Sequence, residues 1–292
     1  MITVLLNCFN ASKTIKKSIK SMLNQSYQDW ELLVWDDGST DDTLSLIRQF
    51  KDKRIRFFSK KCNSGLGKSR QSIIKHANGE FISILDSDDY YHKEKLKRQV
   101  DVFKKNNNIG LCSTWTKVID ENNEVIKVFK SNLNDKKIRE KLMYLNILPN
   151  SSLMYRTKLA KKVGWYSRKL EYSQDYDLTL KLIKVSETYI VKKYLTFIRS
   201  SQNNMTNSFN LKPIIFKENI LNLKKNYLET KDLKEKKIIK DVIDINFIKL
   251  NLLILKKGNL NTFFSLLLIF FRNPLLLFKL NLLKKITEYK NC

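Results

Sequence analysis

The first ninety residues alternate short apolar runs with helical patterns, and this alternation is what most restricts the fold. Apolar runs at 2–9, 30–37, 54–59 and 81–85 are separated by segments whose apolar residues have helical spacing, with Ser12 as the expected N-cap of the first helix. Strands that alternate with helices form right-handed crossovers and a parallel sheet. The sequence therefore predicts an α/β fold with a mostly parallel sheet flanked by helices, and a site at the carboxyl ends of its strands.

Acidic residues gather at two of these strand ends. Asp37 ends the second run, and Asp86, Asp88 and Asp89 follow the fourth. Carboxylates packed this closely resist ionising unless a cation or a hydrogen-bond donor lies among them. Mn²⁺ or Mg²⁺ would fit, because these ions take carboxylate and phosphate oxygens. The pattern predicts a divalent ion carrying a diphosphate. The alternative for the acidic residues at the second strand end is that they form turns and cap helices, and we assign that role to Asp41.

The charge balance of the chain indicates an anionic partner. Lys and Arg number 55 against 29 Asp and Glu, a formal net charge of +26 over 292 residues. A membrane surface, nucleic acid or a phosphorylated substrate would match this charge. The alternative is that the lysines only coat solvated faces. We expect no nucleic acid as partner, because no nucleic-acid-binding signature accompanies the charge.

The remaining composition predicts a cytoplasmic globular protein. The four cysteines show no metal-ligand spacing and are expected to be reduced thiols. A strand pattern begins directly after Met1, so we expect no secretory signal peptide. The longest uncharged apolar run, 258–271, is shorter than the roughly 18 to 20 residues that a spanning helix needs. We therefore expect a protein without a transmembrane helix.

Four blocks of the chain together resemble a known family. They are residues 3–43, 63–71, 77–89 and 173–182, in the order and spacing found in glycosyltransferase family 2. The resemblance runs from about residue 2 to about residue 207. It implies a GT-A (Rossmann-like) fold and an inverting transferase that uses nucleotide sugars. The chain departs from the family pattern mildly, with Cys8 and Phe9 in the first block and Gln174 in the fourth.

The resemblance also implies roles for individual residues. Asp88 binds the metal, Mn²⁺ or Mg²⁺, that bridges the two phosphates, and Asp175 is the catalytic general base. Asp37 contacts the base of the nucleotide and Asp86 its ribose, while Asp89 is a turn or supporting residue. The expected nucleotide-sugar-binding residues are Asn7, Phe9, Asp37, Lys68, Arg70, Asp86 and Arg199. For the three cations among them, the alternative is a solvated helix face or a packing contact.

The expected domain organisation is a catalytic domain followed by a helical extension. Residues 1–208 form the GT-A catalytic domain, with nucleotide-sugar binding in 1–110 and the acceptor side and base in 111–208. Residues 209–292 form a basic and apolar helical extension. Within it, 260–290 is interpreted as a helix lying in the plane of a membrane surface. The alternative is packing on the catalytic domain or on a second subunit.

The leading functional hypothesis is a metal-dependent inverting glycosyltransferase. It would move a sugar from a nucleoside-diphosphate sugar, with UDP favoured, to a glycan or lipid-linked acceptor in surface polysaccharide synthesis such as lipopolysaccharide or capsule. Such an enzyme would be cytoplasmic, with peripheral contact to the inner face of an anionic membrane. Two alternatives remain open. One is a sugar nucleotidyltransferase; the other is a non-enzymatic basic protein that binds a membrane surface or nucleic acid.

Overall fold

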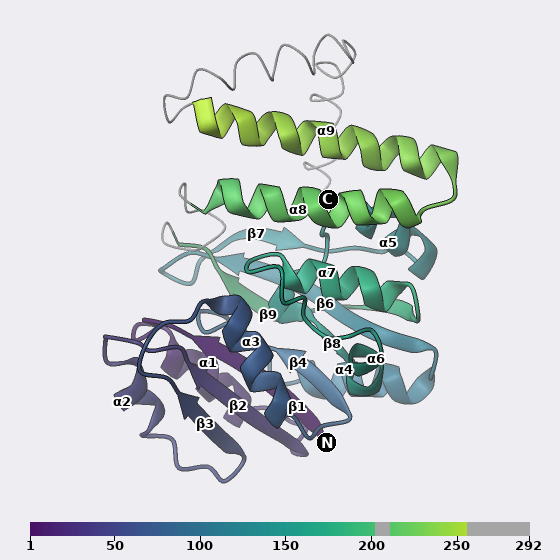
Figure 1. Ribbon diagram of the computed structural model, residues 1–292. Coiled ribbons are helices and arrows are strands. Elements are labelled where there is room, and N and C mark those ends of the chain that lie inside the picture. The colour runs from purple at the N-terminus through teal and green to yellow at the C-terminus, as the bar shows by residue number, and fades with distance from the viewer. Residues whose placement is uncertain (202–210, 256–292) are drawn as a thin grey trace. The chain divides into compact units, whose positions relative to one another are not determined.

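The computed structural model describes residues 1–201 and 211–255, and the chain divides into two compact units (Figure 1). The first unit comprises Met1–Arg139 and Ile147–Ser200. The second comprises Glu140–Asn146 and the residues from Ser201 onward. The predicted membrane-surface helix at 260–290 lies outside the described residues.

The first unit is built on one nine-stranded mixed sheet. Its order is β3-β2-β1-β4-β8-β6-β9-β5, with β7 paired to β6. The first four strands pair in parallel, as the alternation predicted, but β8 is antiparallel to both β4 and β6, so the sheet is more mixed than expected. The strands are β1 (Ile2–Cys8), β2 (Trp30–Asp36), β3 (Ile55–Ser59), β4 (Phe81–Ile84), β5 (Tyr90–Tyr91), β6 (Ile109–Ile119), β7 (Val125–Phe129), β8 (Met154–Arg156) and β9 (Glu187–Arg199).

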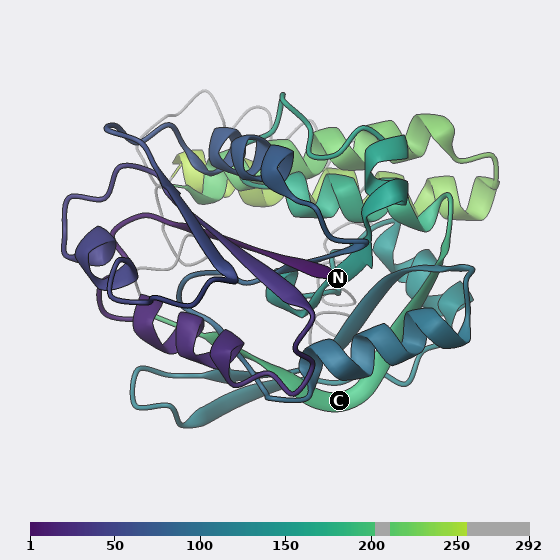
Figure 2. The ribbon, with the colours of Figure 1, turned by 90° about the horizontal axis from the view of Figure 1, so that it is seen from below.

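Helices cover both faces of this sheet, with α1 and α4 on one side and α3 and α7 on the other (Figure 2). Two-sided cover explains why β1, β2 and β4 read as continuous apolar runs and not as alternating ones. The helices of this part of the chain are α1 (Ile15–Leu23), α2 (Thr43–Ile47), α3 (Leu66–Ile73), α4 (Lys95–Lys105), α5 (Asp135–Leu142), α6 (Thr157–Lys162) and α7 (Gln174–Ile183), with short 3₁₀ turns η1 (Ile74–His76) and η2 (Asn150–Ser152).

The start of α1 differs from the prediction. Thr14 is at the N-cap position of α1, so the assignment of Ser12 was wrong. The backbone N–H of Ser12 instead donates to Asp41 Oδ2 at 3.1 Å. Asp41 also accepts the backbone N–H of Thr43, the first residue of α2, at 3.0 Å. The expected turn role of Asp41 is therefore confirmed, and it ties the two helix starts together.

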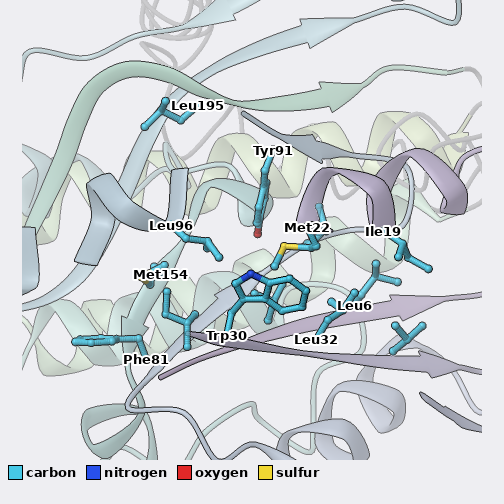
Figure 3. Packing of buried hydrophobic residues seen from close by; sticks show 14 of the residues in the cluster. Leu6, Ile19, Met22, Trp30, Leu32, Phe81, Tyr91, Leu96, Met154 and Leu195 are labelled. Atoms are coloured by element: carbon cyan, nitrogen blue, oxygen red, sulfur yellow. The ribbon is translucent and has the colours of Figure 1, made fainter. Parts of the chain in front are cut away.

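The main core lies between the sheet and the layer of α1 and α4. Trp30, Tyr91 and Leu96 come from β2, β5 and α4 and meet in one buried cluster (Figure 3). Cys8 and Cys112 belong to the same cluster as free buried thiols, which confirms the expectation for these two residues. Because strands, α1 and α4 all contribute, this core fixes the strand ends that carry the acidic residues.

The second unit contains two long helices, α8 (Lys212–Glu229) and α9 (Leu233–Leu255). They pack through a small core formed by Leu223, Ile239 and Val242, against which Met143 and Tyr227 also lie. Neither these helices nor any other within the described residues is long and apolar enough to cross a membrane.

Lys95 is a fully buried lysine in the core of the first unit. Its Nζ donates to Ser83 Oγ at 3.0 Å and to Gln99 Oε1 at 2.9 Å, and lies 3.9 Å from the centre of the Tyr91 ring. Burial lowers the pKa of Lys95 well below its usual value, because the ammonium loses its hydration.

We predict that Lys95→Met removes a pH-dependent component of stability. The folded state binds fewer protons at Lys95 than the unfolded state between the lowered pKa and 10.5. The free energy of unfolding should therefore rise with pH in this window, by up to about 1.4 kcal/mol per pH unit. Urea unfolding of wild type and variant at pH 7 and 9.5 measures it. Lys97→Met, at an exposed position of the same helix, should keep the wild-type slope; an unchanged slope in Lys95→Met would contradict the prediction.

Candidate active site

The turn that follows β4 carries three carboxylates within four residues. It is closed by a hydrogen bond of 3.0 Å from the backbone N–H of Asp89 to the carbonyl oxygen of Asp86. Asp89 is buried, whereas Asp86 and Asp88 are half-buried. Since like charges this close need donors or cations around them, the contacts of the turn separate its structural carboxylates from those left for chemistry.

Three elements that are distant in the sequence brace this turn. In η2, Ser151 Oγ accepts the backbone N–H of Asp86 at 3.1 Å and donates to Asp89 Oδ2 at 2.5 Å. At the end of β9, the backbone N–H of Arg199 donates to Asp89 Oδ1 at 2.9 Å. In α1, Ser18 Oγ donates to the carbonyl oxygen of Asp89 at 2.6 Å. Both carboxylate oxygens of Asp89 are bonded, so this residue supports the turn, as expected.

Asp86 is oriented by an amide and by a guanidinium group. Asn150 Nδ2 lies 3.0 and 3.1 Å from its two carboxylate oxygens, and Arg70 Nη2 lies 3.8 Å from Asp86 Oδ1. The Arg70 side chain, on α3, is buried, and its Nη1 has no hydrogen-bond partner among the described residues. This burial excludes the alternative of a solvated face for Arg70, whereas Lys68 on the same helix is exposed.

Asp88 is a half-buried carboxylate of the turn whose pKa is shifted toward neutral pH. Burial and the Asp86 carboxylate raise the pKa of Asp88 to about 6, and the Arg199 guanidinium opposes the rise. A bound cation would relieve this repulsion. Within the part of the chain that the structure describes, no group of three or more His, Cys, Asp or Glu side chains is placed to hold a metal. A metal here would thus take further ligands from substrate and water.

Asp175 lies in the first turn of α7 and is half-buried. Burial raises the pKa of Asp175 above its usual value, and the Asp86 carboxylate adds to the rise, while the Arg70 guanidinium and the backbone N–H of Tyr176 oppose it. Asp175 therefore shares one electrostatic environment with Asp86 and Arg70. A carboxylate with a raised pKa, close to another carboxylate and an arginine, has the properties of a general base.

Gly67 allows the start of α3 to lie close to the residues around the start of α7, and Gly65 provides the positive φ of the loop before α3. A Cβ on Gly65 would lie 2.3 Å from Glu171 Oε1, and Gly65 has a φ of +89°. A Cβ on Gly67 would lie 2.8 Å from Gln174 Nε2 and 2.9 Å from the carbonyl oxygen of Leu170. The segment GLGK thus has a packing role: it brings the start of α3, and with it Arg70, against the residues that precede Asp175.

Three of the predicted nucleotide-sugar-binding residues, Asn7, Phe9 and Asp37, lie at the carboxyl ends of β1 and β2. Asn7 Nδ2 is buried without a hydrogen-bond partner among the described residues, and the Phe9 ring is 47% exposed. Asp37 accepts hydrogen bonds from the backbone N–H groups of Ser64 and Gly65 at 2.8 and 2.9 Å. Burial alone would raise the pKa of Asp37, but these bonds and that of the Ser64 hydroxyl outweigh it and lower the pKa. Asp37 thereby orders the loop that precedes α3.

The side chain of Arg199 is held by the turn between β6 and β7. Its Nη1 donates to the carbonyl oxygen of Asp120 at 3.0 Å, and its Nη2 donates to Asn123 Oδ1 at 3.0 Å. These contacts agree with the packing alternative for Arg199. Its electrostatic effect on Asp88 nevertheless places its positive charge close to the predicted metal ligand.

Comparison with known proteins identifies the family. Residues 3–164 match the family model described as Glycosyl transferase family 2, which is more than half of the chain. The chain belongs to glycosyl transferase family 2.

Curated relatives and solved structures agree with this assignment. The glycosyltransferase MJ1057 of Methanocaldococcus jannaschii is 32% identical over 63% of this chain and 64% of its own length, less than two thirds of that relative. The UDP-Glc:alpha-D-GlcNAc-diphosphoundecaprenol beta-1,3-glucosyltransferase WfgD of Escherichia coli is 31% identical over 63% of this chain and 70% of its own length.

Two solved structures show the same fold at low identity. S. aureus TarS 1-349 in complex with UDP-GlcNAc has a TM-score of 0.64 and 20% identity, covering 84% of this chain and 71% of that one. The mannosyltransferase PcManGT of Pyrobaculum calidifontis, in complex with GDP-Man and Mn²⁺, has a TM-score of 0.63 and 15% identity, covering 93% and 75%. The predicted α/β fold of GT-A type is confirmed.

This family 2 chain also uses residues that the sequence analysis did not single out. Asn150 and Ser151 orient the acidic turn, and Tyr166 lies close to Asp175 and Arg70. Asn150 and Ser151 lie in η2, shortly before β8, and their place beside the acidic turn could not be inferred without knowing that β8 pairs with β4. For Tyr166 the local signal is Gly164, two residues earlier.

We predict that Gly67→Ala destabilises the protein, although helix propensity alone favours alanine over glycine by about 1 kcal/mol. The added Cβ would overlap the Leu170 carbonyl oxygen and Gln174. Overpacking of this kind should lower the free energy of unfolding by about 1 to 3 kcal/mol. Chemical denaturation measures the change. Ser72→Ala on the same helix should change stability by less than about 1 kcal/mol; a stabilised Gly67→Ala would show that α3 and α7 are not in contact there.

Proposed function

We propose that the chain is a metal-dependent inverting glycosyltransferase that uses a nucleoside-diphosphate sugar, with UDP favoured as the nucleotide. The acceptor would be a hydroxyl group of a glycan or of a lipid-linked sugar, in the synthesis of a bacterial-type surface polysaccharide such as lipopolysaccharide or capsule. The hexosyl or hexosaminyl nature of the transferred sugar belongs to this proposal as well.

One observation supports the proposal most. The acidic turn after β4, the buried Arg70 of α3 and Asp175 of α7 come from three separate elements and share one electrostatic environment. A protein that only coats a membrane or nucleic acid has no need of converging carboxylates. The printed function of the E. coli relative, transfer of glucose from UDP-Glc to a diphosphoundecaprenol-linked GlcNAc, supports a nucleotide-sugar donor and a lipid-linked acceptor.

The residues of the turn fit a divalent ion. Asp88 combines partial burial with repulsion from Asp86, and both effects favour the binding of a cation. Asp88 would be the principal protein ligand of Mn²⁺ or Mg²⁺, and a relative of the same fold is described in complex with Mn²⁺. When bound, the ion would offset the negative charge that grows on the leaving diphosphate.

Asp175 is the proposed general base. An acceptor hydroxyl must lose its proton as it attacks the anomeric carbon, and Asp175 Oδ would accept that proton. Attack from the side opposite the leaving diphosphate would invert the anomeric centre. Arg70 keeps a positive charge beside Asp175, which favours the ionised carboxylate that can act as base.

Peripheral contact with an anionic membrane from the cytoplasmic side is part of the proposal. It rests on the net charge of +26 and on the second unit, where Leu228 and Leu233 are 78% and 80% exposed on either side of the turn between α8 and α9. Exposed Lys231 and Lys234 lie next to them in the sequence. Apolar side chains flanked by lysines are typical of contact with anionic lipid. The division into a catalytic domain, 1–208, and an extension, 209–292, also belongs to this proposal.

We predict that Asp88→Asn weakens Mn²⁺-dependent donor binding by at least about 10-fold, since the variant lacks the charge that would hold the ion. A thermal-stability screen of UDP-, GDP-, CDP- and dTDP-sugars, with and without Mn²⁺, first identifies the donor that stabilises wild type. Calorimetry then compares the variants. Asp101→Asn on α4 is half-buried like Asp88 and should bind as wild type does. Equal Mn²⁺-dependent affinity in Asp88→Asn would refute this metal assignment.

We predict that Asp175→Asn binds the donor within about threefold of wild type but transfers at least about 100-fold more slowly, because only the proton acceptor is lost. The assay uses the donor found in the screen and a diphospholipid-linked GlcNAc as acceptor. Asp135→Asn is the matched control, since Asp135 is also half-buried in the first turn of a helix. Wild-type transfer by Asp175→Asn would remove Asp175 as the base.

A further inference from the structure

Tyr166 is a buried side chain beside the candidate site to which no role has been given above. It lies between α6 and α7, and the two residues before it, Gly164 and Trp165, have φ angles of +84° and +56°. A positive φ in a bulky residue persists only where the surroundings enforce it. Here the backbone N–H of Trp165 donates to the Ala160 carbonyl oxygen at 2.9 Å, and Lys181 Nζ donates to the Trp165 carbonyl oxygen at 3.1 Å.

This backbone is followed directly by Tyr166, whose side chain is only 4% exposed. The same Lys181 forms an ion pair with Asp177 of α7, with Nζ and Oδ2 2.5 Å apart. The strained backbone before Tyr166 is thus fastened to the helix that carries Asp175. This arrangement fixes where the Tyr166 ring lies relative to the proposed base.

The surroundings of the Tyr166 ring are the charged groups of the site. Its hydroxyl lies 3.2 Å from the hydroxyl of Tyr155, and the Arg70 guanidinium carbon lies 5.8 Å from the ring centre. Burial raises the pKa of Tyr166; Arg70 opposes the rise, and Asp175 and Asp86 add to it. The ring thus lies within the field of all three charges.

Arg70 needs such a support because few other groups hold its guanidinium. Its contact with Asp86 is 3.8 Å long, and Nη1 is buried without a hydrogen-bond partner among the described residues. An arginine between two carboxylates can move toward either one. The face of an aromatic ring within about 6 Å attracts a guanidinium and restricts that movement.

We propose that Tyr166 is a positioning residue, whose ring holds the Arg70 guanidinium between Asp86 and Asp175 and so keeps a positive charge beside the proposed base. The inference rests on the proposed function of Asp175. The Tyr166 hydroxyl is paired with that of Tyr155, so the hydroxyl has a partner of its own and the ring face is left for Arg70. Tyr166 acts through Arg70 and does not itself exchange a proton with substrate.

Removal of the ring should change the titration of Asp175. Among the described residues, the charged and titratable groups that act on Asp175 include Arg70 from α3, Asp86 from the turn after β4, and Tyr166 itself. Without the ring, Arg70 moves toward Asp86 or solvent, and Asp175 loses the favourable effect of the guanidinium. The proton then binds Asp175 more tightly.

The experiment measures the Asp175 titration in the metal-free full-length protein by NMR, with ¹³C at the aspartate carboxyl carbons and Asp175→Asn to assign the signal. In Tyr166→Leu, the Asp175 pKa should rise by about 1 pH unit. In Tyr166→Phe, which keeps the ring and loses the hydroxyl, the Asp175 pKa should stay close to that of wild type. Where wild type transfers sugar, the acidic limb of its kcat profile should move upward by the same amount in Tyr166→Leu.

The matched control is Phe103→Leu. Phe103 is also a buried aromatic residue with an arginine near its ring, since the guanidinium carbon of Arg156 lies 5.2 Å from the ring centre. This variant loses comparable packing away from the site, so it should lower the melting temperature without moving the Asp175 titration. A merely structural role for Tyr166 would give the same result in both variants.

An unchanged Asp175 pKa in folded Tyr166→Leu overturns the inference. If Tyr166→Leu does not fold, Arg70→Met gives a second test, because removal of the guanidinium must raise the Asp175 pKa by at least as much; no rise would also overturn it. Failure of the proposed function is a separate result, namely absence of sugar transfer by wild type while the Asp175 titration still responds to Tyr166→Leu.

Discussion

Crowding of three carboxylates into one turn is the constraint on which the rest of the first unit depends. The turn after β4 could not form without donors around it, because each charge raises the cost of ionising the next. The fold supplies those donors from α1, η2 and the end of β9. Each of these elements is itself fixed by the sheet. The mixed strand order, with β8 placed beside β4, is what brings η2 to the turn.

The second requirement is a cation that reaches the turn from the other face of the sheet. Arg70 meets it, but only because α3 lies against the residues before α7. Gly67 makes that approach possible, and a backbone with positive φ at Gly164 and Trp165 turns Tyr166 toward the same guanidinium. Segments almost a hundred residues apart therefore converge through close backbone packing and not through long side chains.

The sequence predicted those parts of the arrangement that are marked by a pattern of apolar residues or by a local motif. Buried parallel strands are continuous apolar runs, and the carboxyl ends of β1, β2 and β4 follow from the crossovers. The residues that hold the acidic turn were not predictable, because Ser151 and Asn150 reach it through a strand pairing that leaves no pattern in the sequence. The assignment of Ser12 as N-cap was wrong for a similar reason: a distant carboxylate, Asp41, binds its backbone N–H.

The same contacts explain how one residue type acquires opposite properties in one site. Asp37 accepts hydrogen bonds from both residues of the Ser64–Gly65 segment, and its pKa falls although it is buried. Asp88 and Asp175 are each affected by burial and by the neighbouring Asp86 carboxylate, and their pKa values rise. Asp89 has both carboxylate oxygens bonded, yet burial and the neighbouring Asp88 and Asp86 raise its pKa as well. Burial and neighbouring charge therefore set the protonation of each carboxylate, whereas the donors around it decide whether it orders the backbone.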